Sequence, residues 1–192
     1  MFEKLRKKLD LNWVRKNGVW DVVVYGSYAR GKDDARDIDV AMILTAPAPA
    51  ARKMQLCQEL RRKLASEGYA LDVKAADLND FLNAGFLGRE AIFAEGRSLV
   101  KRDYVAERFG FAAIAIVEYS LKPLTPSRQK MLYYALQGRK RGTGLLAKLG
   151  GSIISKGVLQ VPTRHYEEIR ELLDREGISY TTTFALRYRI LR

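Results

Sequence analysis

Two acidic residues, Asp37 and Asp39, flank a single isoleucine in an otherwise apolar segment of the chain. The segment 37–44 predicts a β-strand, and on a strand residues two positions apart point to the same side. Both carboxylates would then lie together on one face. Carboxylate oxygens suit Mg²⁺ or Mn²⁺, which is usually held by one or two carboxylates together with substrate phosphates. The pair therefore predicts a divalent-cation site.

A small-residue pair, Gly26-Ser27, precedes these acids and follows the β-branched run 22–25. Such a pair lets a strand turn sharply into a helix, and residues 27–31 are predicted to begin a short one. It also lets backbone N–H groups approach a phosphate. Gly26 and Ser27 are therefore candidate nucleotide-binding residues. Arg30 is a third candidate; pairing of its guanidinium with Asp33 or Asp34 is the alternative.

A third acid, Asp72, is the only acidic residue of the alternating apolar segment 69–74. The segment predicts a further strand, which can lie beside the strand of Asp37 and Asp39. Three carboxylates held together would repel one another unless a cation neutralised them, so a purely structural role gives no reason to keep them. Taken singly, a Gly-Ser turn or an Asp-x-Asp pair is common and often structural.

The order of these motifs resembles a known superfamily. Gly26-Ser27, nine intervening residues and Asp37-Ile38-Asp39 look like the signature of the DNA polymerase β-type nucleotidyltransferases. The sequence 28–31, Tyr-Ala-Arg-Gly, is similar to the minimal nucleotidyltransferase (MNT) branch. Arg36 departs from the pattern, since serine commonly precedes the first aspartate; it either pairs with a substrate phosphate or compensates nearby acids of a solvated loop.

The resemblance implies a mechanism. Asp37 and Asp39 would bridge two Mg²⁺ ions, with Mn²⁺ as an alternative, and Asp72 would share one ion with the acceptor oxygen, so that all three would be catalytic. An acceptor hydroxyl would attack the α-phosphate of ATP or another NTP, and pyrophosphate would leave.

Some members of the MNT branch are antitoxins that transfer AMP to a tyrosine of a HEPN toxin, so the resemblance also implies a HEPN-type partner. Transfer to an RNA end is a second enzymatic interpretation. A non-catalytic nucleotide- or nucleic-acid-binding module that keeps the fold is the alternative from another class. An aminoglycoside acceptor fits less well, because a polycation favours an acidic pocket.

The pattern of elements predicts an α/β (α+β) chain with two parts: a polymerase β-like domain with a mixed sheet over residues 1–105, and a smaller helical/α+β unit over 106–192. In the first part we expect a helix over 2–16 and another up to residue 66. In the second, the apolar run 107–121 and the segment 127–137 predict a helical pair, followed by a small α+β segment.

Positive charge is concentrated in the second part. Residues 1–105 carry 19 Lys and Arg against 15 Asp and Glu, whereas residues 106–192 carry 15 against 7. A basic surface interleaved with aromatic residues predicts RNA or DNA contact by the C-terminal unit, although basic residues that merely solvate helices would give the same composition.

Composition also excludes several classes. The only cysteine, Cys57, permits no intrachain disulfide, and the only histidine, His165, has the surroundings of a surface helix, not of a catalytic triad. No apolar run reaches about 20 residues and the N-terminus lacks the apolar core of a signal peptide, so we expect a cytoplasmic protein without membrane contact. The apolar run 109–117 favours self-association.

Overall fold

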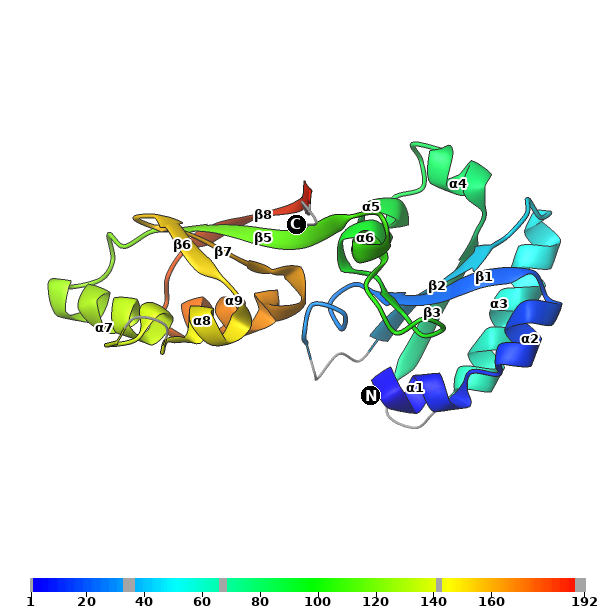
Figure 1. The fold of residues 1–192 in the computed structure, drawn as a ribbon, viewed down its shortest axis with the longest axis horizontal. Helices are drawn as coiled ribbons and strands as arrows, with labels where there is room; N and C mark the ends of the chain where they lie inside the picture. The colour runs from blue at the N-terminus through cyan, green and yellow to red at the C-terminus, as the bar shows by residue number, and fades with distance from the viewer. Residues whose placement is uncertain (1, 33–36, 66–68, 141–142, 189–192) are drawn as a thin grey trace. The chain divides into compact units, whose positions relative to one another are not determined.

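The computed structural model describes residues 2–32, 37–65, 69–140 and 143–188. The chain divides into two compact units, Met1–Phe109 and Gly110–Arg192 (Figure 1). Each unit has its own four-stranded sheet and its own buried core. Among the described residues, no helix has both the length and the apolar character needed to cross a bilayer.

The sheet of the first unit is mixed, with the strand order β3-β2-β1-β4. Strands β1 (Val19–Tyr25) and β2 (Asp37–Leu44) are antiparallel, whereas β3 (Ala70–Ala76) runs parallel to β2. The short β4 (Arg97–Ser98) pairs antiparallel with β1. Helix α3 (Ala50–Leu64) connects β2 to β3, as a parallel pair requires. The mixed sheet predicted from the sequence is confirmed.

One face of this sheet packs against α1 (Phe2–Lys8), α2 (Leu11–Lys16) and α3. The alternate residues Ile38 and Val40 of β2 are fully buried there. The prediction of a single helix over 2–16 is wrong, because the helix is interrupted at Asp10. The Asp10 carboxylate accepts hydrogen bonds from the backbone N–H groups of Asn12 and Trp13, and so starts α2 as an N-cap.

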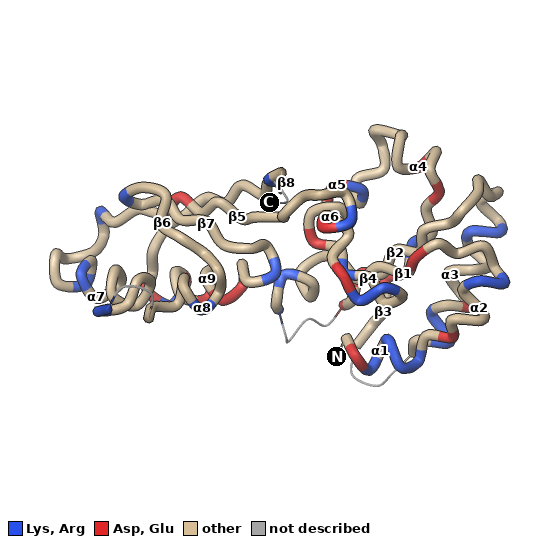
Figure 2. Tube along the Cα trace, viewed as in Figure 1, with Lys and Arg blue, Asp and Glu red and all other residues tan. Residues whose placement is uncertain are grey.

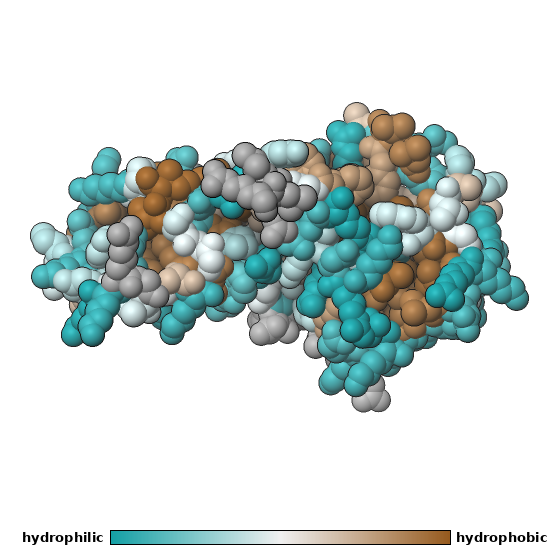
Figure 3. Space-filling model, viewed as in Figure 1, coloured by the Kyte–Doolittle hydropathy of each residue, from teal (hydrophilic) through white to brown (hydrophobic). Residues whose placement is uncertain are grey.

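The opposite face packs against α5 (Gly88–Glu95) and α6 (Val105–Arg108), with α4 (Leu78–Leu82) following β3. Asp77 caps α4 through its side chain. Apolar side chains remain exposed in this region: Leu78 is 66% and Leu82 74% exposed. Figure 3 shows the resulting hydrophobic atoms over α4. This is the sheet face that carries the predicted acids.

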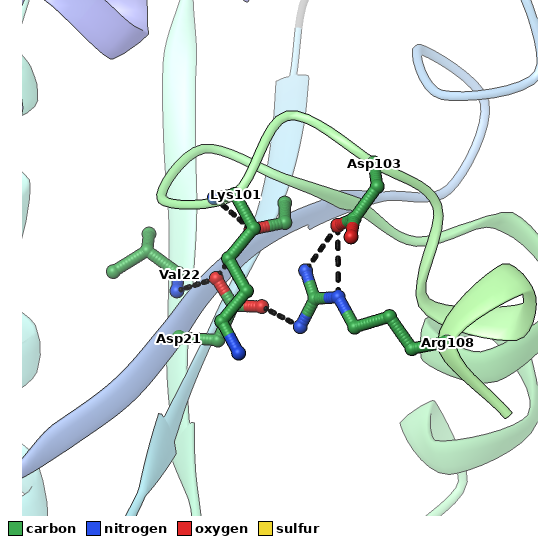
Figure 4. Close-up of polar contacts among 6 residues, drawn as sticks. Asp21, Val22, Lys101, Asp103 and Arg108 are labelled. Carbon is green, nitrogen blue, oxygen red and sulfur yellow. Dashed lines mark hydrogen bonds and ion pairs between the residues drawn. The ribbon is translucent and has the colours of Figure 1, made fainter.

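A buried ion-pair network ties α6 to β1 (Figure 4). The fully buried carboxylate of Asp21 accepts hydrogen bonds from Arg108 Nη1 at 2.7 Å and from the Ser98 hydroxyl at 2.6 Å. The same guanidinium donates through Nε to Asp103 at 2.8 Å. Because each charge has several partners, the network fixes the end of the first unit against its central strand.

The second unit has the element order β-α-β-β-α-β, interrupted by one extra short helix. The elements are β5 (Phe111–Tyr119), α7 (Pro126–Gln137), α8 (Leu145–Leu149), β6 (Ser152–Ser155), β7 (Val158–Pro162), the 3₁₀ turn η1 (Thr163–His165), α9 (Tyr166–Arg175) and β8 (Tyr180–Tyr188). All strand pairs are antiparallel, in the order β6-β7-β5-β8, which is the ferredoxin-like arrangement. Helices α7, α8 and α9 supply the core on one face.

The predicted helical pair is wrong in its first member. The apolar run 107–121 is not a helix: its central part forms strand β5, between β7 and β8. Both faces of β5 carry apolar residues, with Ile114 buried on one face and Ala115 and Val117 on the other, so its sequence lacks the alternation that distinguishes a strand from a buried helix. The second predicted helix exists as α7, and it begins after Thr125, whose hydroxyl accepts from the Arg128 N–H.

Candidate functional site

Asp39 and Asp72 lie directly beside each other on neighbouring strands. In the parallel ladder of β2 and β3, Asp39 is the register partner of Asp72. Asp37 lies two residues earlier on β2, on the same face, while the intervening Ile38 is fully buried on the other. The sheet therefore places all three predicted carboxylates on one face, over two adjacent strands, with Asp37 and Asp72 exposed and Asp39 half-buried.

The turn after β1 approaches Asp39 closely. Gly26 has a φ of +77°, which favours glycine, and a Cβ on it would lie 2.3 Å from Asp39 Oδ2. Residues 27–31 form turns, so the predicted helix at Ser27 is absent. Backbone hydrogen bonds from Arg30 N–H to Gly26 O and from Lys32 N–H to Ser27 O close the segment. The small-residue bend and the acids thus belong to one site.

Two long-range contacts hold this turn. The Tyr28 hydroxyl accepts a hydrogen bond from the backbone N–H of Phe2 at 2.8 Å, which links the turn to α1. The Arg30 guanidinium donates to Glu95 Oε1 of α5, also at 2.8 Å. Glu95 is only 7% exposed, so the pair orients Arg30 from the protein interior. The alternative partners Asp33 and Asp34, and Arg36, lie outside the described residues.

Lys74 brings a cation into the acidic site. Its ammonium lies 3.0 Å from Asp72 Oδ2, and this hydrogen bond raises the pKa of Lys74 above its ordinary value. Tyr25, the register partner of Asp39 on β1, lies on the other side of that acid. Burial raises the pKa of the Tyr25 hydroxyl, and Lys74 opposes that shift. The carboxylates thus face one lysine and one tyrosine.

The electrostatics of Asp39 reflect this surrounding. Burial raises the pKa of its carboxyl; Asp72 and Asp37 raise it further, whereas Lys74 and Arg30 lower it. Accumulated negative charge of this kind favours a cation, and the hard oxygen donors fit Mg²⁺ or Mn²⁺. Within the described residues, however, no three His, Cys, Asp or Glu side chains are close enough to form a ready ligand set.

Sequence reasoning missed Tyr25, Lys74 and Glu95 as members of the site. Lys74 lies two residues after Asp72, on the same face of the strand, and Tyr25 directly precedes Gly26, so both positions were usable signals. Glu95 is 65 residues from Arg30 along the chain, and no local pattern links the two. The single histidine, His165, lies at the end of η1, where its ring contacts Glu168.

Comparison with known proteins agrees with this geometry. Residues 3–121 match the family model described as "Nucleotidyltransferase domain". No curated protein matches the chain.

Solved structures give low-scoring similarities. One of these structures is a tri-AMPylated HEPN toxin of Shewanella oneidensis in complex with MNT antitoxin. A chain of this complex aligns with 19% identity and a TM-score of 0.36, and the alignment covers 69% of the present chain and 96% of the chain in the complex. A toxin–antitoxin with AMP-PNP aligns with 17% identity and the same TM-score, covering 66% and 94%.

Proposed function

We propose that this chain, which belongs to the nucleotidyltransferase domain family, transfers a nucleoside monophosphate from an NTP to a hydroxyl group of an acceptor. The observation that carries the proposal is the side-by-side placement of Asp39 and Asp72 next to the Gly26 turn. Such a reaction needs a phosphate-binding turn and a set of oxygen ligands for a metal ion, because catalysis of phosphoryl transfer is mostly positioning and charge neutralisation.

Mg²⁺ would be held by Asp37, Asp39 and Asp72, and when bound it would neutralise the triphosphate and lower the pKa of the acceptor hydroxyl. Two carboxylates plus phosphate oxygens are a usual ligand set for Mg²⁺, so a ready three-acid cluster is not a requirement. Lys74 must then give up Asp72 or share it, since one carboxylate oxygen now faces its ammonium.

The chain's own residues have distinct tasks in this proposal. Gly26 lets the Asp39 carboxylate lie against the turn. The backbone N–H groups of the turn and the Ser27 hydroxyl would donate to the triphosphate there. Arg30, oriented by Glu95, supplies a fixed positive charge near the phosphates. These contacts place the α-phosphate where the acceptor oxygen can attack in line.

For the acceptor, we favour a hydroxyl on a partner protein, and AMP as the transferred group. The sequence 28–31 resembles the MNT branch, some members of which are antitoxins that transfer AMP to a HEPN toxin, and this resemblance supports an MNT-type antitoxin role. The exposed leucines of α4 support a protein partner, because exposed apolar patches commonly mark protein contacts. Transfer to an RNA end is the second enzymatic option.

A non-catalytic, nucleotide-binding role is the alternative, and the Asp72–Lys74 ion pair is the observation that favours it. In that case the lysine would serve as a permanent countercharge in place of a metal ion. Loss of nucleotidyl transfer with retention of NTP binding would distinguish this role from the enzyme.

The test is an incubation of the full chain with α-³²P-ATP, Mg²⁺ and a cell extract. The proposal predicts a labelled macromolecule whose label is sensitive to protease for a protein acceptor, or to ribonuclease for RNA. Asp37→Asn combined with Asp39→Asn should abolish labelling, whereas Glu171→Gln, at an exposed acid of α9, should not. Label that persists in the double variant would exclude the proposed site.

A further inference from the structure

Charge is segregated within the second unit. Residues 119–166 contain nine Lys and Arg but no Asp or Glu, and five of the six acids in residues 110–192 lie between 167 and 176. Those acids belong to α9 and its C-terminal cap. A surface built only for solubility mixes both signs, whereas a segregated one creates a directed positive field. Figure 2 shows the basic residues of this stretch around α7.

A cluster of cations and tyrosines lies on and beside α7. The Tyr134 ring has Lys130 Nζ 5.8 Å and Arg139 Cζ 6.0 Å from its centroid. The Tyr133 ring, 53% exposed, has its centroid 6.2 Å from that of Tyr134. Tyr133 and Lys156 also line one groove of about 290 Å³. We call these five residues the basic face.

The cations of the basic face are available to a ligand. Within the part of the chain that the structure describes, no carboxylate forms an ion pair with Lys130, Arg139 or Lys156, whereas the nearby Arg128 is paired with Glu176 at 3.1 Å. Unpaired cations next to exposed aromatic rings are the combination that grips a phosphate backbone and stacks on bases.

The open face of the sheet does not offer the same chemistry. RNA-binding sheets of this strand order stack bases on aromatic residues of the two central strands. Here the register pairs Ile114 with Pro162 and Ile116 with Gln160 on the face away from the helices, so aromatic rings are absent from these central positions. The helical side, through α7, is the part of the unit that fits a nucleic acid.

We propose that the basic face binds single-stranded nucleic acid, with Lys130, Arg139 and Lys156 contacting phosphates and Tyr133 and Tyr134 stacking on bases. The cations hold the phosphate backbone of the nucleic acid along α7 and the groove. The tyrosine rings can stack on any base, so binding is not sequence-specific. This activity needs none of the carboxylates of the first unit and is independent of nucleotidyl transfer.

The test measures fluorescence anisotropy of a labelled oligouridine of about 12 nucleotides with the full chain. Three phosphate contacts predict a slope of log K against log salt of about −2, measured between about 50 and 200 mM. Lys130→Gln with Arg139→Gln should weaken binding at least about tenfold and flatten the slope to about −0.7. Tyr133→Ala should weaken binding about tenfold, and Tyr133→Phe should keep it.

The matched control removes the same charge elsewhere, from the exposed Lys7 of α1 and Lys16 of α2, both changed to Gln. Binding should then change by less than about twofold. An equal loss in this control, the absence of salt-dependent binding, or tighter binding to phosphatidylserine vesicles than to the oligonucleotide would overturn the proposal.

Discussion

The carboxylate of Asp39 lies against Gly26, so closely that a methyl group on the glycine would lie 2.3 Å from Oδ2. The two residues come from the end of β1 and from β2, which are adjacent antiparallel strands. The turn at Gly26 and the side chain of Asp39 therefore pack directly against each other. No larger residue at position 26 leaves Asp39 where it is.

Gly26→Ala should displace Asp39 and lower nucleotidyl transfer by about 100-fold, the cost typical of misplacing a catalytic group by about 1 Å. The substitution also introduces backbone strain, because φ is +77°. Gly110→Ala is the matched control: Gly110 has the same φ, but nothing lies within 4 Å of the added Cβ. Both variants carry the same backbone strain, and Gly26→Ala should lose further stability in thermal unfolding because Asp39 must move. Only Gly26→Ala should lose activity. Equal activities would contradict the role of the close contact.

Lys74→Met should tighten Mn²⁺ binding to the chain about fivefold, because the ammonium competes with a cation for Asp72 and one such charge interaction is about 1 kcal/mol in water. Electron paramagnetic resonance of free Mn²⁺ measures this directly, and Lys74→Arg should bind as the wild type does. Lys16→Met, at an exposed site on α2, is the control and should leave affinity unchanged. Weaker Mn²⁺ binding in Lys74→Met would show that the lysine supports the metal site.

Asp77 predicts a pH dependence of stability. The hydrogen bond from Lys53 lowers the pKa of Asp77 to about 2, from an ordinary value of 3.8. Since the folded state holds the ionised carboxylate more strongly, this stabilisation is present above about pH 4 and is lost as the pH falls through about 2, a difference of about 2 kcal/mol. Asp77→Asn keeps an N-cap side chain but loses the charge. Its deficit in the free energy of unfolding by urea should therefore shrink between pH 4 and pH 2; a constant deficit would assign the effect to capping.

Arg108→Met should lower the free energy of unfolding by about 3–5 kcal/mol, because it leaves the carboxylate of Asp21 buried and unpaired. Combining it with Asp21→Asn removes the orphaned charge and should recover part of that loss. Urea unfolding of the two single variants and the double variant measures the coupling. Strictly additive losses would show that Asp21 and Arg108 do not stabilise each other.

The sequence was sufficient for the part of the site that depends on local pattern. The strand period of two places Asp37 and Asp39 on one face, and the apolar alternation around Asp72 identifies its strand. The prediction that the two strands could lie side by side is confirmed by the parallel register. Their alignment residue by residue had no local signal, because register depends on how α3, which connects the two strands, packs on the sheet.

Other features depend on tertiary contacts that no short stretch of the sequence indicates. The strand β5 was mistaken for a helix because it carries apolar residues on both faces and so shows no alternation. The contact of Arg30 with Glu95 joins residues far apart in the chain, so the sequence offered only nearby acids as partners. Lys74 could be seen in the sequence close to Asp72, but its effect on the acids followed only from the 3.0 Å distance between its ammonium and Asp72 Oδ2.

The most direct measurement is a crystal structure of the full chain with Mg²⁺ and a non-hydrolysable ATP analogue. We predict Mg²⁺ about 2.1 Å from oxygens of Asp37 and Asp39, with Asp72 released from Lys74 and directed toward the metal site. The triphosphate should lie against the turn at Gly26 and Ser27. A nucleotide bound elsewhere, or Mg²⁺ absent while Asp72 stays paired with Lys74, would contradict the account.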